Sequence, residues 1–185
     1  MTIQELIKSR RSIRKFKAIP VKNEDLLDII EAGTFAPSGS NTQCYRFVVT
    51  TSSRDIRYLG VNRLSFFKTC KAVILCFADW SVCSNNYPKK SKLFAHLPYL
   101  DCGASMQNML LMATEKGLGT CWITMHPDMK CMDYINHTFE IPTSYEIMGS
   151  IAIGYADEVV DYETGIHAKR PIKRKNINHY IWRKQ

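Results

Sequence analysis

Apolar and polar residues alternate along the chain in patterns that predict helices and strands. Thr2 and Glu5 have the spacing of a capping box, which predicts a first helix that runs out at residues 10–11. A second helix is predicted from a cap at Asn23 to a stop at Gly33, because acidic residues follow the cap and apolar residues recur at helical spacing. The residues expected on its core face are Leu26, Leu27, Ile29 and Ile30.

Four stretches rich in β-branched, aromatic or other apolar residues predict strands. The stretch 72–78 is apolar at every position, which is typical of a strand covered on both faces by helices. Gly149 and Gly154 punctuate the last stretch, and we expect another backbone to approach there closely. The predicted strands cover residues 46–51, 72–78 and 147–155, and a further strand follows a helix stop within residues 117–124.

Three further helices are predicted, over residues 53–67, 100–116 and 127–137. The helix at 100–116 is hydrophobic around most of its circumference, so it is buried either at the centre of the domain or against another subunit. Residues 79–97 break the regular pattern, and they either connect two elements or form a lid over a site.

Length and composition indicate one globular domain over residues 1–185, with a hydrophobic share of 45%. No apolar run approaches the roughly 18 residues needed to cross a bilayer, and the N-terminus lacks the order of a signal peptide. We therefore expect a cytoplasmic protein with no membrane partner.

The seven cysteines are scattered singly along the chain, with no Cys-x-x-Cys pair. This spacing predicts reduced thiols in a reducing compartment. It also weighs against zinc and iron–sulfur centres, because their ligands normally arrive in close pairs. His126 and Cys131 are the nearest His/Cys couple, and one couple does not make a metal site.

The net charge of +8 suits nucleic acid, an anionic cofactor or an acidic redox partner, and charge alone does not choose among them. No zinc-finger spacing and no RNA-recognition signature accompanies the charge, so we expect no nucleic-acid partner. No nucleophile–histidine–carboxylate arrangement and no P-loop is found either, so no catalytic side chain is predicted.

Two polar segments carry the candidate chemistry. Residues 9–14 hold three arginines and two serines, a combination that can bind phosphate through bidentate, charge-assisted hydrogen bonds. Residues 36–43 supply a proline, a glycine and short hydroxyl and amide side chains that can present donors and acceptors to a polar ligand. Taken singly, the first segment is also typical of a solvated face and the second of a simple turn.

Together, the motifs Arg-Arg-Ser-Ile-Arg and Ala-Pro-Ser-x-x-Asn-x-Gln resemble the FMN-dependent nitroreductase family. Further similarity lies in the Gly-Leu-Gly-x-x-Trp-Ile segment at residues 117–123 and in the basic segment before Pro171. The resemblance implies an α+β, nitroreductase-like fold with a central, mostly antiparallel sheet flanked by helices. It also implies a homodimer with the 100–116 helix at the interface and an extended C-terminal arm at residues 177–182.

The resemblance implies an FMN site built from two chains. Arg14 would lie near the N1/O2 edge of the flavin ring, where a cation favours the reduced form. The N-terminal residues would bind the phosphate and the ribityl chain, and the 37–43 segment would come from the partner. The backbone of residues 122–124 would meet the ring near N5. Lys169 and Arg170 would return to the phosphate. The implied cofactor-binding residues are Arg10, Arg11, Ser12, Arg14, Pro37, Ser38, Gly39, Asn41, Gln43, Trp122, Ile123, Thr124, Lys169 and Arg170.

The implied activity is hydride transfer from NADH or NADPH through the flavin to a small-molecule acceptor, such as a nitroaromatic or quinone, with ping-pong kinetics. Two alternatives stay open: a specialised biosynthetic or dehalogenating flavoenzyme, fed in one version by a protein electron donor, and a noncatalytic basic binding domain. The chain departs from the family pattern at Cys44 and Tyr45, where many relatives have proline and tryptophan. It is also short for the family.

Overall fold

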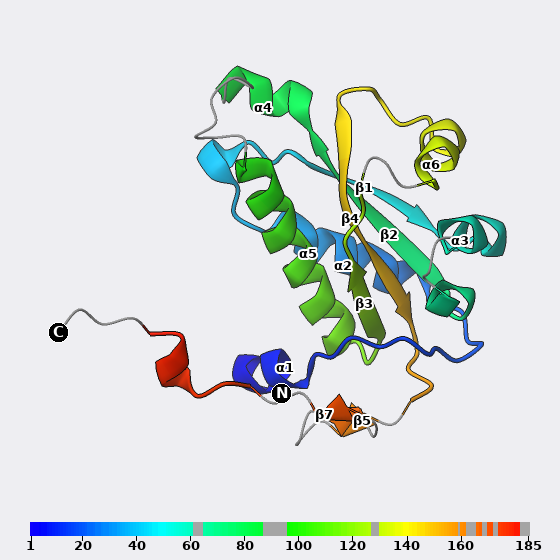
Figure 1. The fold of residues 1–185 in the computed structure, drawn as a ribbon, viewed down its shortest axis with the longest axis vertical. Coiled ribbons are helices and arrows are strands. Elements are labelled where there is room, and N and C mark those ends of the chain that lie inside the picture. Colours follow the sequence, from blue (N-terminus) through cyan, green and yellow to red (C-terminus); the bar gives the residue numbers. More distant parts are fainter. Residues whose placement is uncertain are drawn as a thin grey trace.

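An antiparallel sheet of four strands, in the order β1-β2-β4-β3, forms the centre of the molecule (Figure 1). The computed structural model describes residues 1–60, 65–86, 96–126, 130–158, 160–161, 166–167, 170–171 and 174–181. Three two-residue strands form a second, small sheet in the order β5-β6-β7. The strands are β1 (Tyr45–Thr50), β2 (Ala72–Asp79), β3 (Gly119–Ile123), β4 (Tyr145–Gly154), β5 (Val160–Asp161), β6 (Ile166–His167) and β7 (Arg170–Pro171).

Helices cover both faces of the central sheet. Figure 1 shows α5 on one side of the sheet and α3 and α6 on the other. The α-helices are α1 (Ile3–Ser9), α2 (Asn23–Thr34), α3 (Ser53–Leu59), α4 (Trp80–Asn86), α5 (Leu97–Glu115) and α6 (Met132–Thr138). Short 3-10 helices are η1 (Gly39–Asn41), η2 (Ser65–Lys68) and η3 (Ile177–His179). None of the described helices combines the length and the apolar character needed to span a membrane.

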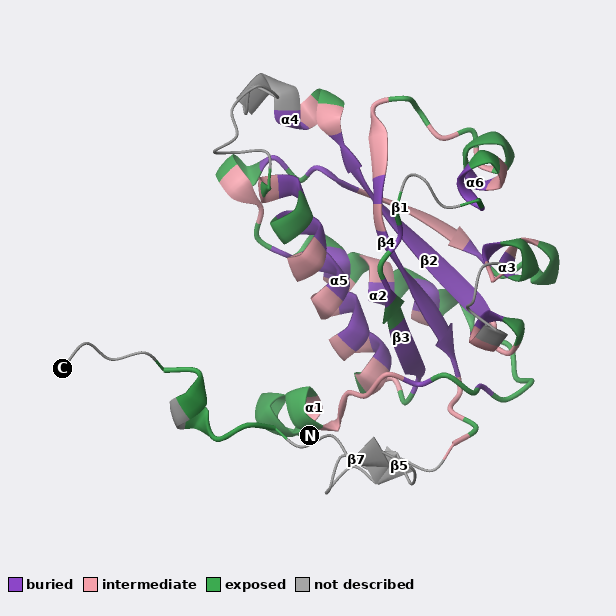
Figure 2. Ribbon diagram, viewed as in Figure 1, coloured by how far each residue is buried: buried purple, intermediate pink, exposed green. Residues whose placement is uncertain are grey.

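Strand β2 is buried at every position, as its continuous apolar sequence predicts (Figure 2). On one face its side chains join those of α2 and α5 in a first core, and on the other they join α3, η2, α6 and the segment after α1 in a second core. A strand between two cores has no solvent-facing side chain, which explains why β2 lacks the polar alternation of a one-sided sheet.

The structure corrects the predicted start and core face of the second helix. Lys22, not Asn23, occupies the position before α2, and it makes no side-chain cap. Leu26 and Ile29 are buried, but Leu27 is 66% exposed and therefore does not belong to the core face. The capping box of Thr2 at α1 is present as predicted.

Other element boundaries also differ from prediction. The 53–67 segment contains two separate pieces, α3 and η2, and residues 61–64 between them lie outside the described part. The irregular 79–97 segment, predicted as a connection or a lid, contains the last residue of β2, helix α4 and the start of α5, and its residues 87–95 lie outside the described part. The predicted start of α6 falls at residues 127–129, which are not described either.

The glycines of β4 make close approaches of two kinds. A Cβ at Gly149 would lie 3.0 Å from the backbone oxygen of Ile123, as expected for an approaching backbone. At Gly154 the neighbour is instead the side chain of Phe16, whose Cδ1 would be 3.0 Å away. Only the first glycine therefore matches the prediction. At the C-terminal end, the predicted extended arm contains η3 and projects away from the body of the molecule (Figure 1).

Replacing Ile29 with alanine should lower the free energy of unfolding by about 2–5 kcal/mol, because the fully buried side chain leaves a cavity between α2 and the sheet. Leu27→Ala on the same helix is the matched control and should change it by no more than about 0.5 kcal/mol. Urea denaturation of both variants measures the two changes. Equal losses would contradict the observed orientation of α2.

Candidate functional site

The arginine-rich N-terminal segment runs across the start of strand β3. Ser12 forms a parallel bridge with Thr120, and the backbone N–H of Ile13 donates to the Thr120 carbonyl at 2.7 Å. Gly119 leaves room for this crossing, because a Cβ there would lie 2.9 Å from Cγ1 of Ile13. The backbone between the arginines is therefore held against the sheet, and it fixes where their side chains start.

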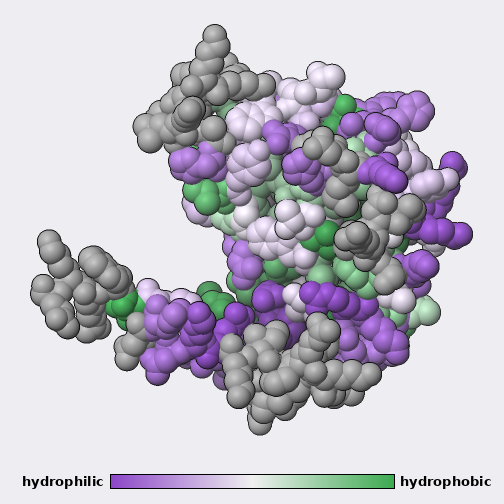
Figure 3. Space-filling model, viewed as in Figure 1, coloured by the Kyte–Doolittle hydropathy of each residue, from purple (hydrophilic) through white to green (hydrophobic). Residues whose placement is uncertain are grey.

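Three guanidinium groups gather beside this crossing; we call Arg10, Arg11 and Arg174 the arginine cluster. Arg10 is half-buried, and burial followed by the charges of Arg11 and Arg174 lowers the pKa of its guanidinium. Within the described ranges, none of the three forms an ion pair with a carboxylate. Figure 3 shows hydrophilic side chains gathered over α1 and the segment that follows it. The cluster therefore concentrates positive charge that no ion pair within the described ranges neutralises, while the carboxylate of Glu158 lies near Arg14.

Arg14 lies near the same end of β3. Burial raises the pKa of the Cys121 thiol, and the positive charges of Arg14 and Arg10 act against that rise, so both arginines are close to Cys121. The backbone N–H of Arg14 donates to Oε1 of Glu158 at 2.6 Å, which fixes its main chain, while its side chain is exposed. A ligand at the arginine cluster would thus also meet the charge of Arg14.

Two buried polar atoms at this place lack a hydrogen-bond partner among the described residues: Nε of Arg11 and Oγ1 of Thr120. The guanidinium of Arg11 is otherwise directed inward, since its Nη1 donates to the carbonyls of Lys8 at 2.5 Å and Arg10 at 2.8 Å. Buried donors and acceptors are normally paired, so these atoms are suited to an additional polar group. An oxyanion would satisfy the Arg11 donor and neutralise part of the cluster's charge.

Strand β3, whose start the arginine segment crosses, has an outer side with which no described strand pairs beyond that crossing. It lies at one margin of the sheet and is bonded to β4 on its inner side. Beyond the bridge at Thr120, no described strand pairs with its outer side, so the backbone from Trp122 to Thr124 can donate to and accept from a ligand. Trp122 is 39% exposed, and Gly149 on β4 leaves room for its indole. We call residues 122–124 the β3 edge.

The second predicted segment forms a loop at residues 37–43 with an unusual backbone. Ser40, Asn41 and Gln43 have φ values of 47°, 54° and 47°, in the left-handed region that disfavours residues with a Cβ by about 1–2 kcal/mol each. Inside the loop, Gln43 N–H donates to Oγ of Ser38 at 2.9 Å, and Gln43 Nε2 donates to Oδ1 of Asn41 at 2.9 Å. Such a backbone requires support from outside the loop.

Asp101 on α5 supplies the first support. Its carboxylate, in a residue only 6% exposed, accepts the backbone N–H of Gly39 at 3.1 Å and 3.2 Å through its two oxygens. Oδ2 also accepts from Thr42 Oγ1 at 3.5 Å and from Cys44 Sγ at 3.8 Å. Burial raises the pKa of Asp101, and the hydrogen bonds from Gly39, Thr42 and Cys44 act in the opposite direction.

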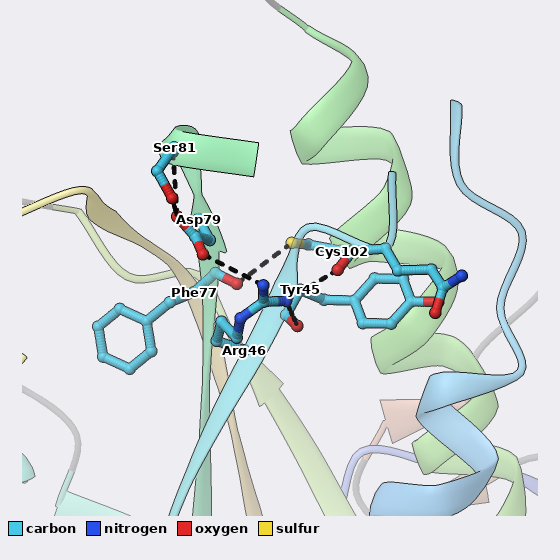
Figure 4. Close-up of polar contacts among 7 residues, drawn as sticks. Tyr45, Arg46, Phe77, Asp79, Ser81 and Cys102 are labelled. Atoms are coloured by element: carbon cyan, nitrogen blue, oxygen red, sulfur yellow. Dashed lines mark hydrogen bonds and ion pairs between the residues drawn. The ribbon is translucent and has the colours of Figure 1, made fainter. Parts of the chain in front are cut away.

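Arg46 supplies the second support, at the other end of the loop. Its Nη1 donates to the carbonyls of Gln43 at 2.8 Å and Tyr45 at 3.0 Å, and its Nη2 lies 3.1 Å from Oδ2 of Asp79 (Figure 4). The Asp79 carboxylate in turn accepts the N–H of Ser81 at 3.0 Å. The loop is therefore fixed at Gly39 by α5 and at Gln43 by the end of β2.

The arginine cluster and the 37–43 loop lie at opposite ends of α5. Asp101, which holds the loop, is near the start of this helix, whereas Thr120, beside the arginines, follows its end. At about 1.5 Å per residue, the stretch from Asp101 to Glu115 is roughly 21 Å long. One chain therefore does not bring the two predicted segments together, and a site that uses both must draw them from two copies.

The C-terminal prediction is only partly covered by the described residues. Lys169 lies outside them, and Arg170 begins β7 with only its backbone described. Arg174, which follows Pro171, instead lies near the N-terminal arginines. Sequence reasoning also missed Asp101 and Arg46; an acid inside an otherwise apolar helix was the available signal for Asp101.

All seven cysteines are free and buried. Four of them, Cys44, Cys76, Cys83 and Cys102, belong to the first core, behind the 37–43 loop. A hydrogen bond with Cys102, together with burial, raises the pKa of Cys44, and burial raises the pKa of Cys83 to about 12. No group of three or more described His, Cys, Asp or Glu residues could hold a metal ion.

Asp101→Asn should speed amide hydrogen exchange of Gly39 about threefold to tenfold, because a neutral amide oxygen is a weaker acceptor than a carboxylate. Exchange of the peptide covering residues 37–44 measures this effect. Asp133→Asn, at an exposed position on α6, is the control and should leave that peptide unchanged. Unchanged exchange in Asp101→Asn would mean that the loop does not depend on this carboxylate.

The same variant should alter the dependence of stability on pH. Because the pKa of Asp101 is raised in the folded protein, the folded state binds this proton more tightly than the unfolded state. Its contribution is complete below the unfolded pKa of about 3.9 and is lost as pH rises through the folded pKa. Urea denaturation across this window should therefore show a smaller decline with rising pH for Asp101→Asn than for the wild type. Parallel curves would contradict the raised pKa.

Comparison with known proteins gives one family. The sequence model of the nitroreductase family matches residues 7–69 and 59–155. An Archaeoglobus fulgidus protein, provisionally named an NADH dehydrogenase/NAD(P)H nitroreductase, is 27% identical over 161 residues, covering 85% of this chain and 87% of that protein. A Vibrio harveyi NADPH-flavin oxidoreductase is 27% identical over 164 residues, covering 83% of this chain and 65% of that protein.

Solved structures share the fold. A nitroreductase family protein from Streptococcus pneumoniae TIGR4 superposes with a TM-score of 0.81 at 19% identity, covering 99% of this chain and 100% of that chain. A provisionally named nitroreductase from Desulfovibrio desulfuricans, solved in complex with FMN, gives 0.74 at 23% identity, covering 100% and 98%. The antiparallel sheet flanked by helices is thus the fold that the sequence motifs implied. Because the family model matches well over half of its length, this chain belongs to the nitroreductase family.

Proposed function

We propose that this protein is an FMN-dependent oxidoreductase that transfers hydride from NADH or NADPH through flavin N5 to a nitroaromatic, quinone or similar acceptor, with ping-pong kinetics. The observation that carries the proposal is the arginine cluster, in which half-buried Arg10 and Arg11 lie near exposed Arg174. No carboxylate among the described residues forms an ion pair with the cluster, and a donor of Arg11 is unsatisfied. A phosphate monoester fits this donor set. The sequence has no adenine-nucleotide fingerprint, which favours FMN over FAD.

In this proposal the chain's own residues bind and orient the cofactor. Arg10, Arg11, Ser12 and Arg14 hold the phosphate and ribityl chain, and the unpaired backbone of the β3 edge receives the ring. Bound flavin would supply the redox chemistry, so the protein contributes position, electrostatics and access rather than an acid or base. Arg14 supplies positive charge at the N1/O2 edge of the ring. Lys169 and Arg170 are proposed to add to the phosphate site.

The 37–43 loop of a second copy completes the proposed site. Its contributing residues would be Pro37, Ser38, Gly39, Asn41 and Gln43, held open by Asp101 and Arg46 of the same copy. The separation of the loop from the arginine cluster along α5 supports this division between chains. A homodimer of single-domain chains, each spanning residues 1–185, follows from it.

Arg10→Ala and Arg14→Ala should each weaken FMN binding by roughly 1.5–3 kcal/mol, or about one to two decades in Kd, because each removes a charge-assisted partner of the phosphate or ring. Titration of FMN into deflavinated wild-type and variant protein at fixed ionic strength measures the loss. Lys17→Ala, which removes an exposed cation three residues after the arginine segment, is the control for overall charge and should bind within about twofold of the wild type. Purified protein that is colourless and takes up no FMN would overturn the proposal.

Leu100→Asp should convert the proposed dimer to monomer, because it places a charge on the exposed side of α5, where Leu100 is 61% accessible in the single chain. Sedimentation equilibrium measures the mass. Leu27→Asp, at an equally exposed leucine on α2, is the matched control and should remain dimeric. A wild-type monomer loaded with FMN would contradict a site shared between chains.

A further inference from the structure

A cavity of about 360 Å³ lies between α3 and η2, away from the site described above. Its volume falls in the range of small-molecule pockets in proteins. Figure 1 shows α3 on the side of the sheet opposite α5. No residue of the 37–43 loop or of the arginine cluster is among the described residues that line this cavity. The lining residues are Ser53, Ile56, Arg57, Lys68, Cys70 and Lys71.

One wall of the cavity is a single face of α3. Ser53, Ile56 and Arg57 are spaced three and four residues apart, so a helix presents them on one side. Ile56 is buried in the second core, which fixes the rotation of the helix and directs its neighbours Ser53 and Arg57 along the same face. The packing of Ile56 in the second core therefore determines where Arg57 lies.

The other wall comes from η2 and the turn that leads into β2. The backbone N–H of Cys70 donates to the Phe67 carbonyl at 3.2 Å, and that of Lys71 donates to the Ile153 carbonyl at 2.9 Å. These bonds fix the main chain that carries Lys68 and Lys71. Two lysines thus face the arginine of α3 across the cavity, over a floor formed in part by buried Ile56 and Cys70.

The positive charge of this cavity has no carboxylate partner within the described part of the chain. Among the described residues, none forms an ion pair with Arg57, Lys68 or Lys71. The acid on α3, Asp55, is engaged elsewhere, since its two oxygens accept from Thr50 Oγ1 at 2.9 Å and Tyr134 OH at 2.8 Å. Three cations around one cavity repel one another, and a bound anion would remove that repulsion.

We propose that the α3–η2 cavity is an accessory site for a multiply charged phosphoryl anion, as carried by a small phosphorylated metabolite. Arg57 provides bidentate hydrogen bonds to phosphoryl oxygens, Lys68 and Lys71 provide charge, and the Ser53 hydroxyl provides a further donor. The apolar floor accommodates the uncharged part of the ligand. This site is independent of FMN binding, because none of its residues belongs to the arginine cluster or the β3 edge.

Titration with inorganic pyrophosphate, followed by isothermal calorimetry on the protein as purified and saturated with FMN, tests the site. Saturation of the arginine cluster with FMN beforehand removes it as a competing anion site. The wild type should bind pyrophosphate saturably at fixed ionic strength. Arg57→Gln and Lys71→Gln should each weaken binding at least about tenfold, as expected for loss of a charged hydrogen-bond partner. If the protein binds no FMN, the same titration on the cofactor-free protein still tests the cavity.

Arg54→Gln is the matched control, because Arg54 lies on the same helix and carries the same charge but does not line the cavity. It should bind within about twofold of the wild type. Absence of saturable binding, or equal weakening by Arg54→Gln, would overturn the proposal. Citrate that binds as tightly as pyrophosphate would overturn the assignment to a phosphoryl group. Unchanged melting temperatures of the cofactor-free variants serve as the check on folding.

Discussion

The complete burial of β2 between two cores constrains where polar chemistry can occur in this protein. A central strand with helices on both faces offers no side chain to a ligand, so polar groups collect at the margins of the sheet. The β3 edge and the arginine segment that bridges to it at Thr120 are one such margin. The loop held by Asp101 and the cavity beside α3 lie at others. Each of these polar features lies outside the two hydrophobic cores and is therefore accessible to a ligand.

Helix α5 sets the distance between the two polar segments of the candidate site. Its inward face packs in the first core through Met106 and Met109, which prevents it from bending or shifting without loss of packing. Asp101 is rigidly placed at one end of this helix, and the start of β3 follows its other end. The loop is therefore presented by a fixed scaffold, although its own backbone includes three strained residues.

Local patterns predicted the elements well where one interaction dominates. The capping box at Thr2, the apolar run of β2 and the length of β4 need no tertiary information. The prediction that Asn23 caps the second helix was wrong, because Asn23 is already the first residue of α2. The prediction that Leu27 lies on the core face was also wrong, because spacing alone does not define which side of an amphipathic helix packs against a partner.

The residues of the candidate site could be predicted from the sequence, but the residues that position them could not. Its arginines and its polar loop stand out because such residues have few structural uses in these combinations. The residues that hold the loop could not be predicted from the sequence. Asp101 is 62 positions from Gly39, and Asp79 comes close to Arg46 only because their strands pair in the sheet. The resemblance implied that the basic C-terminal segment returns to the phosphate site, but it named Lys169 and Arg170 and not Arg174, which lies near Arg10.

The burial of the thiols has a consequence for chemical resistance. Quinones and the nitroso products of nitroaromatic reduction are electrophiles that add to thiolates. Cysteines with ordinary exposure and pKa would be alkylated by the compounds that an enzyme of this proposed class handles. Here burial raises the pKa of Cys70 to about 12, and it also raises the pKa of Cys131 and of Cys121. All seven thiols are buried, which makes each of them a poor target for an electrophile from solution.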